Sequence, residues 1–282
     1  FEQALIDLGY DNVLDDYVIT SNISSVTTLD VGEKGISSLE GVKSFSSLET
    51  LYFINNGGSP ANNISALDLS GLNNLTFIQG FSNPLTSLIL PSNVEYLDIS
   101  NNSLTQLDLS GLTKLETLSL RNSQLSSIDL SSNDNLETIS LGNSSNLTCV
   151  KLSSNQYNNI FPSNYASGSL SIGLNSDNTT ILNTDCDNLD MSNILYVTSN
   201  DNSDYTVVGK DSTGDINGAD PDLNFNVGDA IYFYVNANGN RTPHYFHLKD
   251  QASTRTGNQI SLSETYLGLV IWKPDTAGTY YY

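Results

Sequence analysis

The sequence is poor in positive charge. Its 282 residues include ten lysines and arginines against 31 aspartates and glutamates, which gives a formal net charge of −21. Phosphate backbones and anionic lipid surfaces would repel such a chain, so we expect neither nucleic acid nor a membrane surface as a partner. The sequence contains no apolar run of the length that a bilayer-spanning helix needs, and no membrane insertion is expected.

Residues that commonly carry catalysis are scarce as well. Histidine occurs only as His244 and His247, in one segment, which leaves a general acid or base without most of its usual partners. The motifs G-x-S-x-G and H-E-x-x-H and the phosphate-binding glycine loop are absent. We therefore expect a protein that is not an enzyme.

Cysteine is equally rare. Cys149 and Cys186 are the only two, and they lie 37 positions apart (186 − 149 = 37). In an oxidising compartment a bond between them would stabilise the fold by roughly 3 to 4 kcal/mol, because it constrains the unfolded chain. We predict a disulfide. Free thiols or a metal-binding pair are the alternatives, and neither has a neighbouring histidine or further cysteine to support it.

What the sequence does contain is a short repeat. The pattern L-x-x-L-x-L returns between residues 94 and 152 as VEYLDI, LTQLDL, LETLSL, LSSIDL, LETISL and LTCVKL. Its central positions form two interleaved series with steps of 21 or 22 residues: Leu97, Leu118 and Ile139, then Leu107, Ile128 and Val150. Because side chains alternate across a strand, each L-x-L unit points both apolar residues to one side. The pattern predicts stacked coils with two strands each, and hence two parallel sheets that face each other.

The flanking regions differ from the repeats. Residues 1–8 have the apolar spacing of a helix, which predicts a helical cap that ends at Gly9. From residue 194 onwards, apolar and polar residues alternate between turn signals, a pattern typical of a small antiparallel β-sandwich. We predict a mostly β protein with a solenoid domain at residues 1–190 and a sandwich domain at residues 191–282, the second continuing beyond the end of this chain.

The first region resembles a known family. The opening FEQALIDLGYDNVLDDYVITSNISSVTTLDV, the paired L-x-x-L-x-L units, and LTCV at 147–150 with DC at 185–186 resemble the N-terminal cap, repeats and C-terminal cap of secreted leucine-rich repeat proteins of marine Bacteroidetes. The likeness covers residues 1–190. It implies a leucine-rich repeat solenoid with an extracellular binding or adhesion role and no shared enzymatic activity.

The second region resembles the cupredoxin-like domains of marine bacterial and phage surface proteins. Copper in a cupredoxin needs two histidines, a cysteine and a weak axial ligand. His244 matches the first histidine position, but the positions of the other ligands would lie after Tyr282, and His247 would face the same side only if a bulge intervened. We therefore expect no copper in this chain.

A column of outward positions on the second predicted sheet reads Asp68, Ile89, Asp108, Asp129 and Lys151. Strands in a sheet lie ~4.8 Å apart, so Asp108 and Asp129 would be close like charges, which is unfavourable unless water or a cation screens them. Calcium bound by this pair is one hypothesis. A solvated acidic face is the alternative, and no cofactor is otherwise expected.

The first predicted sheet carries the candidate ligand-binding residues. Its outward positions place aromatic rings beside a column of carboxylates: Tyr52, Phe77, Tyr96, Glu95, Glu116 and Glu137. Protein and sugar recognition uses exposed rings next to polar groups, although single exposed rings are also ordinary surface features. The sequence thus predicts an extracellular, non-enzymatic module that binds a protein or glycan through the solenoid. The alternative is a structural subunit of a virion or extracellular filament that acts by self-association.

Overall fold

The structure is a computed structural model, and the chain divides into two compact units. Unit 1 comprises Phe1–Ile160 with Ser167–Cys186, and unit 2 comprises Phe161–Ala166 with Asp187–Tyr282. The structure describes residues 1–156, 171–173, 181–183, 186, 194–198, 206–211, 214–219, 223–225, 231–236, 267–272 and 278–280. The predicted division at residue 190 stays a prediction.

Unit 1 begins with the helical cap that the sequence predicts. Helix α1 (Glu2–Asp7) buries Ala4 and Leu5, and Gly9 follows it with a φ of 80°, a left-handed conformation that glycine adopts without strain. Phe45, from the first coil, is fully buried and lies 6.3 Å from Phe1 between ring centroids. The short helix α2 (Thr20–Ile23) then leads into the first strand. The cap thus covers the open end of the solenoid core with apolar side chains.

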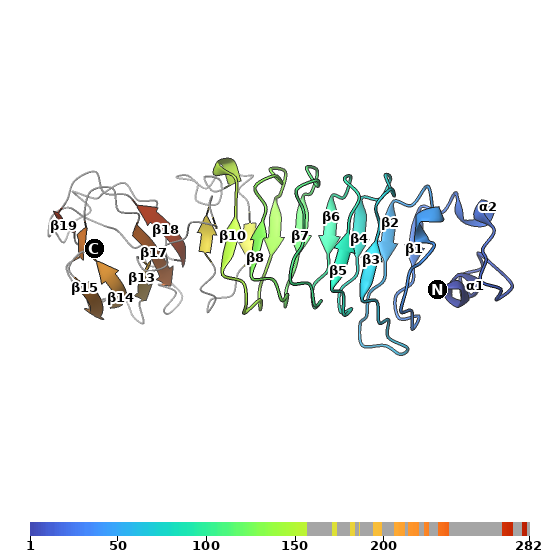
Figure 1. The fold of residues 1–282 in the computed structure, drawn as a ribbon, viewed down its shortest axis with the longest axis horizontal. Helices are drawn as coiled ribbons and strands as arrows, with labels where there is room; N and C mark the ends of the chain where they lie inside the picture. The colour runs from blue at the N-terminus through green and yellow to red at the C-terminus, as the bar shows by residue number, and fades with distance from the viewer. Residues whose placement is uncertain are drawn as a thin grey trace. The chain divides into compact units, whose positions relative to one another are not determined.

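The first sheet runs without interruption along the solenoid (Figure 1). Its strands are parallel, in the order β1 (Thr28–Asp30), β2 (Thr50–Tyr52), β4 (Phe77–Gln79), β6 (Tyr96–Asp98), β7 (Thr117–Ser119), β9 (Thr138–Ser140) and β11 (Ser171–Gly173). Leu97, Leu118 and Ile139 are paired in register and buried, as the 21-residue step predicts. A 3₁₀ helix, η1 (Val42–Ser44), lies in the first coil between β1 and β2.

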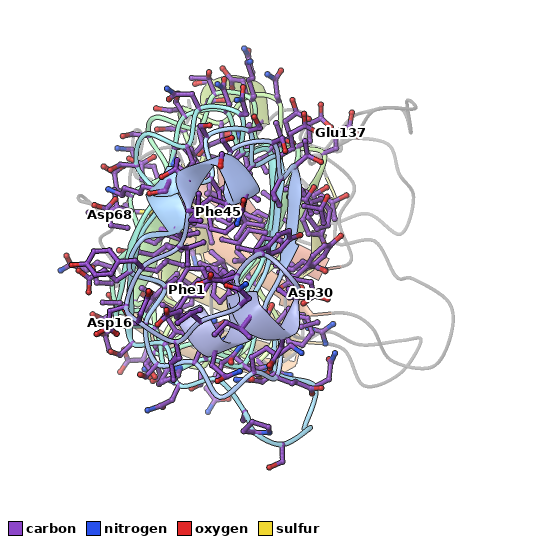
Figure 2. All side chains as sticks on the ribbon, turned by 90° about the vertical axis from the view of Figure 1, so that its right-hand side faces the viewer. Phe1, Asp16, Asp30, Phe45, Asp68 and Glu137 are labelled. Atoms are coloured by element: carbon purple, nitrogen blue, oxygen red, sulfur yellow. A yellow bond between two sulfur atoms is a disulfide. The ribbon has the colours of Figure 1, made fainter. Side chains whose placement is uncertain are left out.

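The second sheet is parallel too, but it is divided. Strand β3 (Ala66–Asp68) pairs with β5 (Ser87–Ile89), and β8 (Ser127–Asp129) pairs with β10 (Cys149–Lys151), which pairs with β12 (Ile181–Asn183). The predicted parallel-sheet solenoid is confirmed. Figure 2 views the solenoid from its end, with Asp68 projecting on one side and Asp30 and Glu137 on the other.

The break falls at Leu107–Leu109, which keeps the L-x-L pattern without forming a strand. The preceding coil is short: Leu88 to Leu97 spans nine positions (97 − 88 = 9), whereas Leu107 to Leu118 spans eleven (118 − 107 = 11). This shorter link contains Pro91, which is buried and has no backbone N–H to donate. The shortened link thus directly precedes the coil in which the break falls.

Polar side chains in the turns satisfy backbone groups that the strands leave unpaired. Asn102 is buried and donates from Nδ2 to the carbonyl of Ile99 at 2.9 Å, while its Oδ1 accepts from the amide of Leu85 at 3.1 Å. Three asparagines at 21-residue spacing have a positive φ, which asparagine tolerates better than most residues: Asn101, Asn122 and Asn143. These asparagines shape the turns of the solenoid.

Cys149, on β10, is bonded to Cys186, with the two Cα atoms 6.0 Å apart. The predicted disulfide is therefore present in the structure. It joins the second sheet to a segment 37 residues further along the chain.

The described strands of unit 2 form two small sheets. One has the order β15 (Gly214–Ala219), β14 (Thr206–Asp211), β13 (Ile194–Thr198), β17 (Ile231–Asn236) and β18 (Leu267–Trp272); in the other, β16 (Leu223–Phe225) pairs with β19 (Gly278–Tyr280). All these pairs are antiparallel except β13 with β17, which is parallel. The cupredoxin-like sandwich stays a prediction. His244 and His247 lie outside the described residues.

A candidate recognition face on the first sheet

Three aromatic side chains lie in a row on the outward side of the first sheet, and we call them the aromatic stack; Phe77 and Tyr96 are stacked, and the Tyr52 ring is tilted by 55° against Phe77. Phe77 and Tyr96 are register partners on β4 and β6, and their rings lie nearly parallel, 4.2 Å apart between centroids. Tyr52, on β2, lies 5.6 Å from Phe77. All three side chains are half-buried, and Gln79 donates from Nε2 to the Tyr96 hydroxyl at 3.3 Å. The structure thus brings together the three aromatic residues that the sequence singled out.

The stack leaves one face of Tyr96 uncovered by an aromatic neighbour. Phe77 covers the β4 side of the ring, whereas the register partner on the β7 side is Thr117, a much smaller residue. Because the two rings are stacked nearly parallel, the other face of Tyr96 is directed along the sheet towards Thr117. A flat or cationic group could lie over that face.

A column of carboxylates runs beside the stack. The amide of Glu116 donates to the carbonyl of Glu95 at 2.8 Å, and the amide of Glu137 donates to the carbonyl of Glu116 at 2.9 Å, so the three residues occupy equivalent positions on successive coils. All three are exposed. None forms an ion pair or a side-chain hydrogen bond with any residue that the structure describes.

The described strand positions on the outward side of the first sheet carry no cation. We compare three positions for each of β1, β2, β4, β6, β7 and β9: the first and third residues of the strand and the residue before it. None of these positions holds lysine or arginine. The acidic residues at these positions are Asp30, Glu49, Glu95, Asp98, Glu116 and Glu137. We call this surface, with the aromatic stack, the recognition face.

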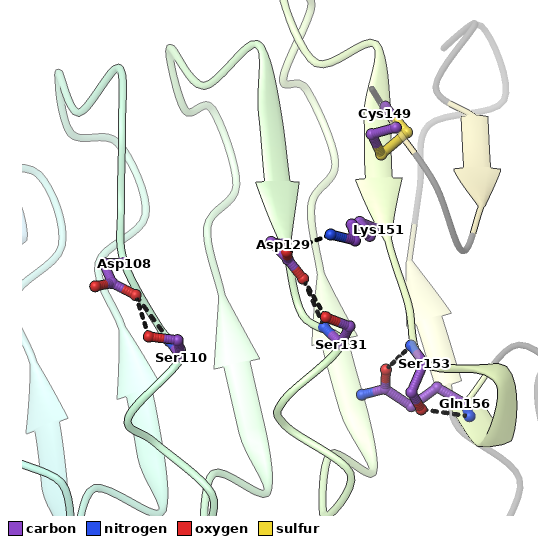
Figure 3. A network of polar contacts seen from close by, with 9 residues as sticks. Asp108, Ser110, Asp129, Ser131, Cys149, Lys151, Ser153 and Gln156 are labelled. Carbon is purple, nitrogen blue, oxygen red and sulfur yellow. Dashed lines mark hydrogen bonds and ion pairs between the residues drawn. A yellow bond between two sulfur atoms is a disulfide. The ribbon is translucent and has the colours of Figure 1, made fainter. Parts of the chain in front are cut away.

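The carboxylates of the second sheet accept hydrogen bonds within their own turns (Figure 3), as Asp98 of the first sheet does from Ser100. Asp108 Oδ1 accepts from the Ser110 hydroxyl at 2.7 Å and from the Ser110 amide at 2.9 Å. These two bonds, the hydroxyl first, hold the pKa of Asp108 below its usual value. Calcium at Asp108 and Asp129 stays a prediction.

Asp129 makes the same pair of bonds with Ser131, at 2.6 and 2.9 Å, and Lys151 Nζ lies 3.0 Å from its other carboxylate oxygen. Partial burial raises the pKa of Asp129, but the bonds from Ser131 and the charge of Lys151 outweigh it and leave that pKa lowered. Lys151 thus pairs with this carboxylate in the structure.

A similar pair lies at the other end of the second sheet. Lys43, from η1, donates to Asp68 at 2.6 Å and to the Ser70 hydroxyl at 2.9 Å. The Lys43 bond, followed by the bonds from Ser70, lowers the pKa of Asp68 to about 2. Beside this pair, Leu39, Ala66 and the exposed Ile89 line part of an open hollow.

The cap holds a group of acidic residues that the sequence reasoning missed. One carboxylate oxygen from each of Glu2, Asp11 and Asp15 lies within 4.8 Å of the other two. Both oxygens of Glu2 accept backbone amides, those of Asp15 at 2.8 Å and Asp16 at 3.0 Å, while Asp11 Oδ2 is buried without a hydrogen-bond partner. The acidic segment DNVLDD at residues 11–16, shortly after the helix, is the sequence feature that could have indicated this group. In the structure, the bonds from the amides of Asp15 and Asp16 to Glu2 hold the cap loop against α1.

Membrane insertion can be checked on the described residues, where no helix is both long and apolar enough to cross a bilayer.

Residues 92–132 match the family model of leucine rich repeats in two copies. Three solved structures from Listeria monocytogenes are also similar. They are the functional domain of InlJ (28% identity, 48% of this chain, 32% of that chain, TM-score 0.39), internalin C2 (22%, 54%, 91%, 0.25) and internalin F (17%, 64%, 68%, 0.28). This chain thus spans about a third of the InlJ domain. The TM-scores are below 0.5, so these likenesses assign no function. No curated protein matches. The coils over residues 92–132 are leucine-rich repeats.

Proposed function

We propose that this chain is a protein-recognition module that works outside the cytosol and binds its partner on the recognition face. The single observation that carries the proposal is the stack of Tyr52, Phe77 and Tyr96 on the outward side of the first sheet. Leucine-rich repeats generally mediate protein–protein interactions, which supports a protein as the partner.

The stack suits binding for an energetic reason. Aromatic side chains supply large contact areas, and ordering them on binding costs little entropy because they have few rotatable bonds. Here the rings already contact one another, so much of that ordering cost is met before a partner arrives. Residues of this kind supply most of the binding energy in many protein interfaces.

Two further features support an extracellular setting and a binding role without catalysis. The Cys149–Cys186 disulfide would persist in an oxidising compartment, which favours an extracellular setting. The recognition face lies on a sheet whose outward threonines and serines flank the rings, and such a surface favours binding over a reaction that needs a water-excluding cleft.

The test is a selection of displayed peptides and small domains with the wild-type chain, followed by affinity measurements on the selected clones. The double variant Phe77→Ala/Tyr96→Ala is expected to bind them at least about tenfold more weakly, the loss typical of interface anchors. Tyr17→Ala is the matched control, because Tyr17 is 79% exposed and lies in the cap. Thermal unfolding of each variant checks that it is folded.

The proposal fails if the clones bind the double variant as tightly as the wild type, or if repeated selections return no clone that depends on the face. Equal losses in the double variant and in Tyr17→Ala would also contradict it, because the loss would then not belong to the stack.

A further inference from the structure

The two sides of the solenoid differ in how their negative charge is balanced. On the second sheet, Lys43 pairs with Asp68 and Lys151 pairs with Asp129. On the recognition face, Glu95, Glu116 and Glu137 are exposed and have no cationic partner among the described residues. The negative charge of the recognition face is therefore available to a ligand.

The position of the carboxylates relative to the rings adds a second constraint. Glu95 and Glu116 directly precede Tyr96 and Thr117, which are register partners. A cation placed over the free face of Tyr96 would thus lie beside Thr117, and the residue before each of these two is an exposed glutamate. Rings attract cations through their negative faces, and carboxylates attract them by charge.

We infer that the partner presents a basic polypeptide segment to the recognition face, with a lysine or arginine over Tyr96 and its neighbours paired with Glu95, Glu116 and Glu137. This inference rests on the proposed function and names the chemistry of its partner. Arginine fits best, because its planar guanidinium stacks on a ring while its N–H groups donate to carboxylates. Charge complementarity of this kind also raises the rate of association.

A sugar is the main competitor for an aromatic surface. A neutral oligosaccharide would also stack on Tyr52, Phe77 and Tyr96, but it would not depend on the negative charge of the glutamate column. The two partners are therefore distinguished by removing that charge while leaving the rings in place.

The experiment uses the full chain and a fluorescent peptide that alternates arginine and threonine, with binding followed by anisotropy at low and physiological salt. The face variant is Glu95→Gln/Glu116→Gln/Glu137→Gln. The matched control is Asp7→Asn/Glu40→Gln/Asp134→Asn, which removes the same number of charges from exposed positions elsewhere on the solenoid. A peptide with glutamate in place of arginine and a neutral hexasaccharide complete the set.

We expect the face variant to weaken binding of the arginine peptide at least about tenfold and the control variant to change it less than about twofold. Tyr96→Leu should weaken it as well, and Tyr17→Leu should not. Equal losses in the two triple variants would overturn the inference, since general attraction to an acidic protein would explain them. So would failure of the arginine peptide to bind, or binding of the hexasaccharide that the face variant retains.

Failure here is separable from failure of the proposed function. Selected clones that need Phe77 and Tyr96 but bind the Glu→Gln face variant normally would refute the basic partner and leave protein recognition intact. Clones that ignore both the rings and the glutamates would refute the proposed function itself.

Discussion

The two sheets of the solenoid are built from one L-x-L unit, yet their acidic residues do different work. On the second sheet the acid is an aspartate followed two positions later by serine, as in Asp108 with Ser110 and Asp129 with Ser131. The short aspartate side chain reaches its own turn and accepts bonds there. On the first sheet Asp98 makes the same two bonds with Ser100, but the residue before the strand is a glutamate in β6, β7 and β9, and these glutamates are exposed. The comparison teaches that the aspartates serve local folding on both sides, whereas the glutamates of the first sheet remain available for binding.

The sheets also differ in continuity. The first pairs seven strands without a break, whereas the second is divided at Leu107–Leu109. A solenoid is held together by contacts between neighbouring coils, so a break on one side leaves the other side to carry more of the coupling. The predictions below test this difference and the difference in charge, from the largest expected effect to the smallest.

Removing the disulfide should have the largest effect. In Cys149→Ser/Cys186→Ser the unfolded chain loses a constraint over 37 residues, and the free energy of unfolding should fall by about 4 kcal/mol in the chain-entropy model. Urea unfolding measures the change. Hydrogen exchange should accelerate at β10 of the second sheet before it does at β2 and β4 of the first. Uniform acceleration along the solenoid would contradict this order.

Substitution of core leucines should lower the free energy of unfolding more in the continuous first sheet than at the break in the second sheet. Leu118 is fully buried on β7, in the middle of the first sheet, and Leu118→Ala should cost about 2 to 5 kcal/mol of unfolding free energy. Leu107→Ala, at the break in the second sheet, should cost less than half as much, because Leu107 is only partly buried. Equal losses in urea unfolding would show that the break has no energetic consequence.

The sequence predicted those parts of the molecule that follow from periodicity. The 21-residue step fixes the register of Leu97, Leu118 and Ile139. Phe77 and Tyr96 are only 19 residues apart (96 − 77 = 19), but each directly precedes the central apolar residue of its repeat unit, Ile78 or Leu97, and alignment of the units places them opposite each other. The stack was therefore readable from the outward positions of successive repeats. The asparagine turns follow from the same step.

Features that depend on a single coil were not readable in this way. The break at Leu107–Leu109 leaves the L-x-L pattern intact, so the pattern gives no sign of it. Lys43 reaches Asp68 from η1, outside any column of the repeat, so no spacing predicted the pair. The contact of Glu2 with Asp15 and Asp16 depends on how an irregular loop folds back.

The Lys43–Asp68 ion pair on the second sheet should make the free energy of unfolding depend on pH. The pKa of Asp68 falls from 3.8 to about 2 on folding, so its carboxylate stabilises the fold above about pH 4, and this contribution is lost as the pH falls through 2. The difference in unfolding free energy between wild type and Asp68→Asn should therefore be present at pH 5 and shrink towards zero near pH 2. A difference that persists unchanged at pH 2 would show that it does not come from the ionised carboxylate.

The smallest effects should differ in sign between the sheets. Glu116 lies between Glu95 and Glu137 on adjacent strands, so Glu116→Gln relieves like-charge repulsion and should raise the free energy of unfolding by about a few tenths of a kcal/mol. Asp108→Asn replaces a charged acceptor, whose pKa is lowered by the bonds from Ser110, with a weaker neutral one, and it should lower stability at neutral pH. Both variants remove one negative charge, so they are matched controls for each other. Changes of the same sign would mean that net charge, and not position on the two sheets, governs the response. Stability changes of opposite sign would show that the glutamate column on the recognition face lowers the stability of the free protein. Binding of a partner to these glutamates would then offset that loss.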